Sequence, residues 1–129
     1  MPKFKCKMMN LDQPSYNRTI YSREALENAL ENKSVVPVYL GNSMELGNLA
    51  GAAKLTANYP ELLIDCSISE TEAGKIANEL LSKKQAKFAL NGTCKKIPGE
   101  NDTSIITTAN ISSINIISNP VTRAKLEDN

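Results

Sequence analysis

The chain has 129 residues, enough for one domain of ordinary size and too few for two. Its 15 basic and 14 acidic residues give a net charge of +1, which excludes the strongly basic surfaces that bind nucleic acid or anionic membranes. The chain contains no histidine, so the commonest general base at neutral pH and the commonest ligand of catalytic zinc are both missing.

The core and the cysteines also limit the class of protein. Hydrophobic residues make up 41% of the chain but aromatic residues only 5%, so we expect an aliphatic core. Cys6, Cys66 and Cys94 are odd in number and form no CxxC pair, which predicts buried, reduced thiols and no disulfide, metal or cofactor. The opening residues lack the apolar segment of a signal peptide, and no run reaches the about 18 apolar residues that span a bilayer. We therefore expect synthesis in the cytoplasm and no membrane partner.

The first third of the chain predicts a strand, a loop, a helix and a second strand. Apolar side chains alternate over residues 4–9, whereas residues 10–20 contain Pro14 and indicate a loop. Ser22 can cap a short helix whose apolar stripe is Leu26, Ala29 and Leu30. Residues 35–40 then form a short apolar strand, in which Pro37 predicts an edge position or a bulge.

The middle of the chain predicts a hairpin followed by a helix. Residues 46–57 and 62–68 are strand-like and are separated by an Asn-Tyr-Pro turn, so they can pair. Ser69 and Glu72 have the spacing of a capping box. The helix after them has a 3.6-residue apolar period, formed by Ala73, Ile76, Ala77, Leu80 and Leu81.

The last third predicts three strands and a tail. The strands cover residues 86–97, 103–109 and 111–117, with a turn at residues 98–102. The order of elements predicts an α+β fold, a small and mostly antiparallel β-barrel or sheet with two flanking helices. We expect one domain over residues 1–121 and a polar, frayed C-terminal tail over residues 122–129.

No catalytic, cofactor-binding or metal-binding residue emerges from the residues alone. Gly41, Gly47 and Gly51 match neither phosphate-binding glycine motif and indicate turns. Serine–lysine neighbours, such as Ser34 with Lys33, have the character of solvated surface. Asp65 interrupts an apolar strand, and alternation predicts that it points outward.

Four segments, taken in order, resemble the prohead (capsid maturation) proteases of bacteriophages. NRTIYSREALENAL, residues 17–30, resembles the early N-G-R-x-Y-x-x-E-x-L segment of that family. VPVYLGNSMELGNL, residues 36–49, is similar in layout to the segment that supplies the catalytic histidine, and KFALNGTCKK, residues 87–96, resembles the LSIGF-like strand of the serine nucleophile. SINIISNP, residues 113–120, resembles the late EISLVSNP strand. The resemblance spans about residues 17–121 and implies that the late strand lies in the centre of the barrel.

The resemblance also implies a catalytically degenerate homologue. The histidine position falls near Gly41 and the nucleophile position on Leu90, and neither side chain can serve as a base or a nucleophile. We therefore expect a pseudoenzyme, a non-catalytic bacteriophage virion protein that binds a capsid protein, another virion protein or a second copy of itself, without nucleic acid. Two alternatives stay open: an active serine hydrolase or peptidase with a base other than histidine, and a cytoplasmic inhibitor or regulator that binds another protein.

Overall fold

The computed structural model describes residues 2–15, 18–118 and 124–128. Within these residues the chain forms strands, two α-helices and one short 3-10 helix, η1. In chain order the elements are β1 (Lys3–Asn10), β2 (Thr19–Tyr21), α1 (Arg23–Asn32), β3 (Val35–Leu40), η1 (Leu46–Asn48), β4 (Leu49–Asn58), β5 (Glu61–Ile68), α2 (Glu72–Ser82), β6 (Lys87–Pro98), β7 (Ser104–Ile117) and β8 (Ala124–Asp128).

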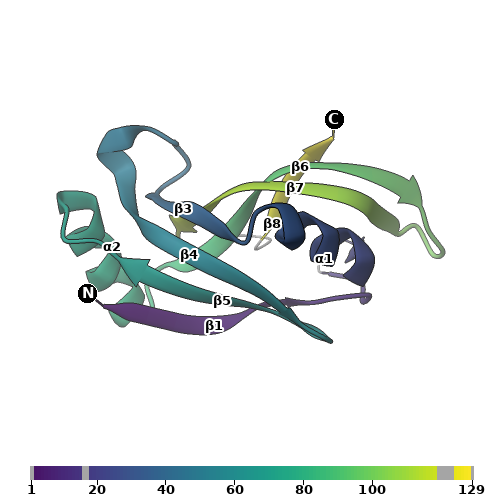
Figure 1. Ribbon diagram of the computed structural model, residues 1–129, viewed down its shortest axis with the longest axis horizontal. Helices are drawn as coiled ribbons and strands as arrows, with labels where there is room; N and C mark the ends of the chain where they lie inside the picture. Colours follow the sequence, from purple (N-terminus) through teal and green to yellow (C-terminus); the bar gives the residue numbers. More distant parts are fainter. Residues whose placement is uncertain (1, 16–17, 119–123, 129) are drawn as a thin grey trace.

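The strands of the described residues form one eight-stranded mixed sheet that curls into a half-barrel (Figure 1). Its order is β1-β5-β4-β3-β7-β6-β8, and β2 pairs with β7 outside this path. The pairs β1–β5, β3–β4, β4–β5 and β6–β7 are antiparallel. The pairs β2–β7, β3–β7 and β6–β8 are parallel. The predicted α+β fold with two helices is confirmed. The prediction of a mostly antiparallel sheet fits roughly, because the antiparallel pairs outnumber the parallel ones.

Strand β7 is the centre of the sheet, because it pairs with β2, β3 and β6. We predicted two strands here, but residues 104–117 form one continuous strand of 14 residues. The single strand is possible because β6 pairs with it over its whole length and two register shifts absorb the irregularities. The central place that the family resemblance implied for this strand is confirmed.

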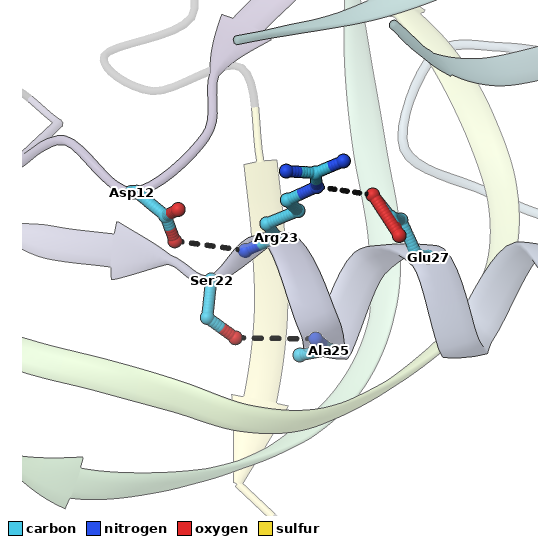
Figure 2. Close-up of polar contacts among 5 residues, drawn as sticks. All are labelled: Asp12, Ser22, Arg23, Ala25 and Glu27. Atoms are coloured by element: carbon cyan, nitrogen blue, oxygen red, sulfur yellow. Dashed lines mark hydrogen bonds and ion pairs between the residues drawn. The ribbon is translucent and has the colours of Figure 1, made fainter. Parts of the chain in front are cut away.

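Helix α1 begins where two side chains satisfy its first amide groups (Figure 2). The Ser22 hydroxyl accepts from the Ala25 amide at 3.2 Å, as predicted for the cap, and it donates to the Ile106 carbonyl at 2.7 Å. The Asp12 carboxylate accepts from the Arg23 amide at 2.9 Å. Ile106 belongs to β7 and Asp12 follows β1. The start of this helix is therefore hydrogen-bonded to β7 and to the segment that follows β1.

Helix α2 begins two residues later than the predicted capping box. Thr71, not Ser69, is the N-cap, and its hydroxyl accepts from the Gly74 amide at 3.0 Å. Ser69 instead lies 3.2 Å from the Thr71 hydroxyl, so it supports the cap. The predicted apolar stripe is narrower than expected, because Ala73 and Ala77 are buried whereas Ile76 is 48% exposed.

Several smaller predictions are corrected by the structure. Residues 19 and 20, expected in a loop, form β2 together with Tyr21 beside β7, and residues 124–128, expected to fray, form β8 beside β6. The division between a domain of residues 1–121 and a tail of residues 122–129 stays a prediction. Cys66 and Cys94 are buried as expected, but Cys6 is exposed.

The predicted hairpin is confirmed by the pairing of β4 with β5. Pro37 pairs with Ala52 on one side, and the pairing of β3 with β7 begins only at Val38. Proline has no amide proton, and at Pro37 no residue of β7 is paired that would need one. A register shift between Val38 and Tyr39 follows directly. In the described part of the chain, neither helix is long and apolar enough to cross a membrane.

Candidate functional site

Two polar side chains lie fully inside the molecule near the end of β7. Ser113 is 0% exposed and Asn115 is 3% exposed, while their neighbours Ile114 and Ile116 fill the hydrophobic core. Because successive side chains of a strand point to opposite faces, Ser113 and Asn115 share the face away from that core. Buried polar groups destabilise a fold unless they are hydrogen-bonded, so this pair is a candidate for a functional site.

A bulge in β7 places Ser113 on this face. Asn91 of β6 pairs with Ser113, but the next residue, Gly92, pairs with Ile111, so Ser112 is an extra residue in β7. One extra residue reverses the alternation, which is why Ile111 and Ile114 both face the core although three positions separate them. Without the bulge, alternation from Ile111 would have turned Ser113 into the core.

The polar residues form one connected group, here called the Ser113–Asn115 cluster: Ser113, Asn115, Asn91, Met44 and the carbonyl of Gly41. The Ser113 hydroxyl donates to Asn115 Oδ1 at 2.9 Å, and the Asn115 amide donates to the Gly41 carbonyl at 2.7 Å. Met44 Sδ lies 3.3 Å from Ser113 Oγ and 3.8 Å from Asn91 Nδ2. The cluster therefore joins β6 and β7 to the loop between β3 and β4.

This loop, residues 41–48, covers the cluster and carries apolar side chains on its outside. Gly41 begins it with a φ of +80°, a conformation that L side chains rarely adopt. Its amide donates to the Ile116 carbonyl at 2.8 Å, so both polar backbone groups of Gly41 are bonded to β7 or to its side chains. Farther along, Met44 is 53% exposed and Leu46 is 85% exposed. The loop is thus fastened at one end and presents a hydrophobic tip to solvent.

The chemistry available in the cluster is hydrogen bonding. The acceptors next to the Ser113 hydroxyl are an amide oxygen and a thioether sulfur, and neither takes up a proton at neutral pH. Asn91 carries an amide whose only hydrogen bond in the described structure is the weak one to Met44 sulfur. If the loop moves aside, the Asn91 amide becomes available to a polypeptide carbonyl, whereas the single proton of the Ser113 hydroxyl stays bonded to Asn115.

The two positions singled out by the family resemblance do not form a site with each other. Leu90 is fully buried in the core, and β7 lies between β6 and β3, the strand that ends before Gly41. Leu90 lies level with Val38 across β7, so two strand spacings, roughly 10 Å, and three residues along the strand, roughly another 10 Å, separate it from Gly41. The Gly41 carbonyl and Asn91, the residue after Leu90, do belong to the Ser113–Asn115 cluster. Sequence analysis missed this cluster, although the three-residue spacing of Ile111 and Ile114 was a signal for the bulge.

The remaining candidates have structural explanations. Asp65 points outward as predicted and lies 3.9 Å from Lys5 of the neighbouring strand. Gly51 lies where a Cβ atom would come within 2.1 Å of the Ser67 carbonyl, so close strand contact requires glycine there. Among the described residues, no group of three histidine, cysteine or acidic side chains could hold a metal ion.

The comparisons with known proteins identify the fold. No protein-family model matches the chain, and no curated protein sequence matches it significantly. The structure is similar to the solved structure of the bacteriophage T4 capsid assembly protease, gp21, with a TM-score of 0.76 and 12% sequence identity. The match covers 92% of this chain and 82% of that chain. The fold is thus like that of a prohead protease, as the resemblance implied.

One prediction is contradicted by this comparison. We expected the chain not to be an enzyme, but a solved structure with a similar fold is that of a protease. At 12% identity the likeness shows the fold alone, and it demonstrates no loss of catalytic residues. The presence of Gly41 and Leu90 therefore does not prove that the chain is inactive. The chain has a protease-like fold.

Proposed function

We propose that this chain acts in bacteriophage capsid assembly as a virion protein whose partner is the capsid protein or another protein of the particle. The observation that carries the proposal is the likeness of nearly the whole chain to a capsid assembly protease, with a TM-score of 0.76. Fold alone does not fix function, so the proposal needs a surface that can bind a polypeptide.

The loop of residues 41–48 supplies that surface. Its exposed Met44 contacts Ser113 and Asn91 of the Ser113–Asn115 cluster, and the exposed Leu46 follows two residues later in the same loop. Apolar side chains beside buried hydrogen-bond donors are a usual arrangement for holding a polypeptide, because the apolar contacts provide affinity and the donors fix its position. A capsid segment that displaces the loop would replace the weak contacts of Met44: one of its carbonyls would accept from the Asn91 amide, and one of its amides would donate to the Ser113 oxygen.

Mass spectrometry of purified phage particles tests the virion role. We expect the chain in the particles at a fixed ratio to the capsid protein. Its absence from particles, together with its presence in the infected cell extract, would refute the virion role and favour an inhibitor or regulator that binds another protein.

A pair of surface variants tests the binding loop. Leu46→Asp should weaken capture of the capsid protein from a phage lysate at least about tenfold, because a charge at an interface core opposes desolvation. Ile97→Asp is the matched control, since Ile97 is also an exposed aliphatic residue but lies near the turn after β6. Equal loss of capture in both variants would contradict the assignment of the loop.

A second candidate function is peptide hydrolysis with Ser113 as the nucleophile. The protease-like fold and the buried, hydrogen-bonded hydroxyl of Ser113 favour it. The reaction needs a base to accept the hydroxyl proton, and this base must reach Ser113 after the loop moves, because Asn115 and Met44 cannot hold a proton.

Incubation of the purified chain with purified capsid protein tests this second function. Cleavage that disappears in Ser113→Ala and persists in Ser112→Ala would establish it, since Ser112 is the neighbouring bulge residue. Intact capsid protein after prolonged incubation with the unmodified chain would refute it.

A further inference from the structure

The half-barrel is open along one side, where β1 is the edge strand of the sheet. Among the residues that the structure describes, β1 pairs with β5 only, so half of its backbone amide and carbonyl groups point away from the sheet. At the start of β6, the described pairing with β8 begins at Leu90. Residues 87–89 of β6 therefore have β7 as their only strand partner within the described chain.

A cavity of about 190 Å³ lies between these two strands. Phe4 and Cys6 of β1, Leu81 of α2 and Phe88 of β6 line it, and Lys5 and Lys87 stand at its rim. Phe88 and Ala86 are almost fully buried, whereas Cys6 is exposed, so the cavity has an apolar floor and an open mouth. Its size suits one apolar side chain.

The charges around this cavity are not balanced. None of its lining residues is acidic, and Lys87 forms no ion pair with any residue that the structure describes. The outer face of the same sheet differs, because there Lys5 lies 3.9 Å from Asp65 and Lys7 lies 3.8 Å from Glu61. The basic residues of the outer face thus have partners within the chain, and the rim of the cavity keeps a positive charge for a partner from outside.

We propose that this opening binds an extended acidic segment of another protein, which pairs as an additional strand with β1. One apolar side chain of the segment enters the cavity between Phe4 and Phe88, and a carboxylate of the segment lies beside Lys87. A second copy of this chain is a poor occupant, because pairing two β1 strands would bring Lys3, Lys5 and Lys7 close to the same lysines of the other copy. The proposal does not depend on the capsid role.

Cys6 provides a direct measurement of occupancy. It lines the cavity and is exposed, whereas Cys66 and Cys94 are buried. The probe is the peptide acetyl-Asp-Val-Phe-Val-Glu-amide, and the readout is the rate at which iodoacetamide, a neutral reagent, modifies Cys6. We expect the rate to fall about tenfold when the peptide is present at about ten times its Kd. The peptide acetyl-Lys-Val-Phe-Val-Lys-amide should leave the rate unchanged.

A matched pair of charge variants completes the test. Lys87→Glu should abolish the protection of Cys6, whereas Lys54→Glu, an exposed lysine of β4 that does not line the cavity, should retain it. Equal protection by the two peptides, equal protection in the two variants, or no protection at all would overturn the proposal. Protection that appears without peptide as the protein concentration rises would also overturn it, because it would identify a second copy as the occupant.

Discussion

At the scale of single residues, the few buried polar side chains carry more structural information than the many buried aliphatic ones. Asn115 joins two parts of the chain, since it bonds to the Gly41 carbonyl and to Ser113 of its own strand. The sequence shows why Ile114 and Ile116 are core residues, but not that the asparagine between them is buried. Its burial depends on a loop that comes from more than 60 residues earlier in the chain, roughly the separation at which local patterns carry no signal.

The first prediction concerns Asn115. Asn115→Ala removes both hydrogen bonds and leaves the Gly41 carbonyl and the Ser113 hydroxyl without their partner, so the free energy of unfolding should fall by about 1–3 kcal/mol. Urea denaturation followed by circular dichroism measures the change. Asn110→Ala, at an exposed position of the same strand, should change the stability by less than about 0.5 kcal/mol. Equal effects of the two changes would show that the cluster does not stabilise the fold.

The second prediction concerns the thiols. Burial raises the pKa of Cys66 to about 12, with smaller contributions from Cys6 and Asp65, so this thiol is neutral and shielded at pH 8. Cys94 is also buried, and only Cys6 is exposed. The native protein should therefore release about one equivalent of chromophore quickly with Ellman's reagent, since thiolate character and exposure govern reactivity. Cys6→Ser should remove the fast phase, and two or more fast equivalents in the unmodified protein would contradict the structure.

At the scale of elements, local patterns predict those elements that local contacts build. The β4–β5 hairpin and both helices follow from turn residues, caps and apolar periods. Details that depend on distant segments are not predicted. Thr71 caps α2 because its hydroxyl also lies 3.2 Å from the Leu49 carbonyl of β4. Strand β2 forms because β7 lies beside it. The bulge at Ser112 likewise results from the pairing with β6.

The third prediction concerns Gly74 in the first turn of α2, where a close contact with the segment just before the helix opposes helix propensity. Alanine in the middle of a helix is normally more stable than glycine by about 1 kcal/mol. At this position, however, a Cβ atom would lie 2.0 Å from the Ser69 carbonyl oxygen, a backbone atom that cannot move freely. Gly74→Ala should therefore destabilise the protein by about 1–3 kcal/mol in thermal or urea denaturation. Gly47→Ala, where nothing lies within 4 Å, is the control. A stabilised Gly74→Ala variant would contradict the placement of the helix.

At the scale of the whole molecule, the family resemblance predicted the arrangement better than the individual motifs did. The α+β class and the central position of the late strand are confirmed, and the structural match covers 92% of the chain. The site was not predictable in the same way. Gly41 and Leu90 were chosen by similarity of short motifs, and a shift of one residue in a strand exchanges the core face for the opposite face. Leu90 lies on the core face, whereas Asn91 lies on the face of the cluster.

The fourth prediction concerns the pH dependence of stability. Without histidine, no side chain with an unperturbed pKa titrates between about pH 5.5 and 8, so the free energy of unfolding should be nearly constant there. A hydrogen bond and charge attraction from Lys83 lower the pKa of Glu79, so its contribution is present above its unfolded pKa and is lost as the pH falls. A hydrogen bond with Asp12 raises the pKa of Tyr59, so its contribution is present below its unfolded pKa and is lost as the pH rises.

Cys66 acts in the same direction as Tyr59. Its pKa of about 12 lies above the ordinary value of 9.0, so its contribution is present at neutral pH and is lost as the pH rises from about 9 toward 12. Urea midpoints measured from pH 4 to pH 11 should thus show a plateau with losses at both ends. A steep slope between pH 6 and pH 8, at about the pKa of histidine, would contradict this expectation.

The position of β7 in the sequence has a consequence for synthesis. The strand that joins β2, β3 and β6 consists of residues 104–117, so the earlier strands emerge from the ribosome well before their common partner exists. The β4–β5 hairpin can form at once, but β3 waits for residues more than 70 positions later, roughly the kind of distant pairing that slows folding. During translation the edge of β3 is therefore unprotected for several seconds, at about 5–20 residues per second, and chaperone binding is expected there.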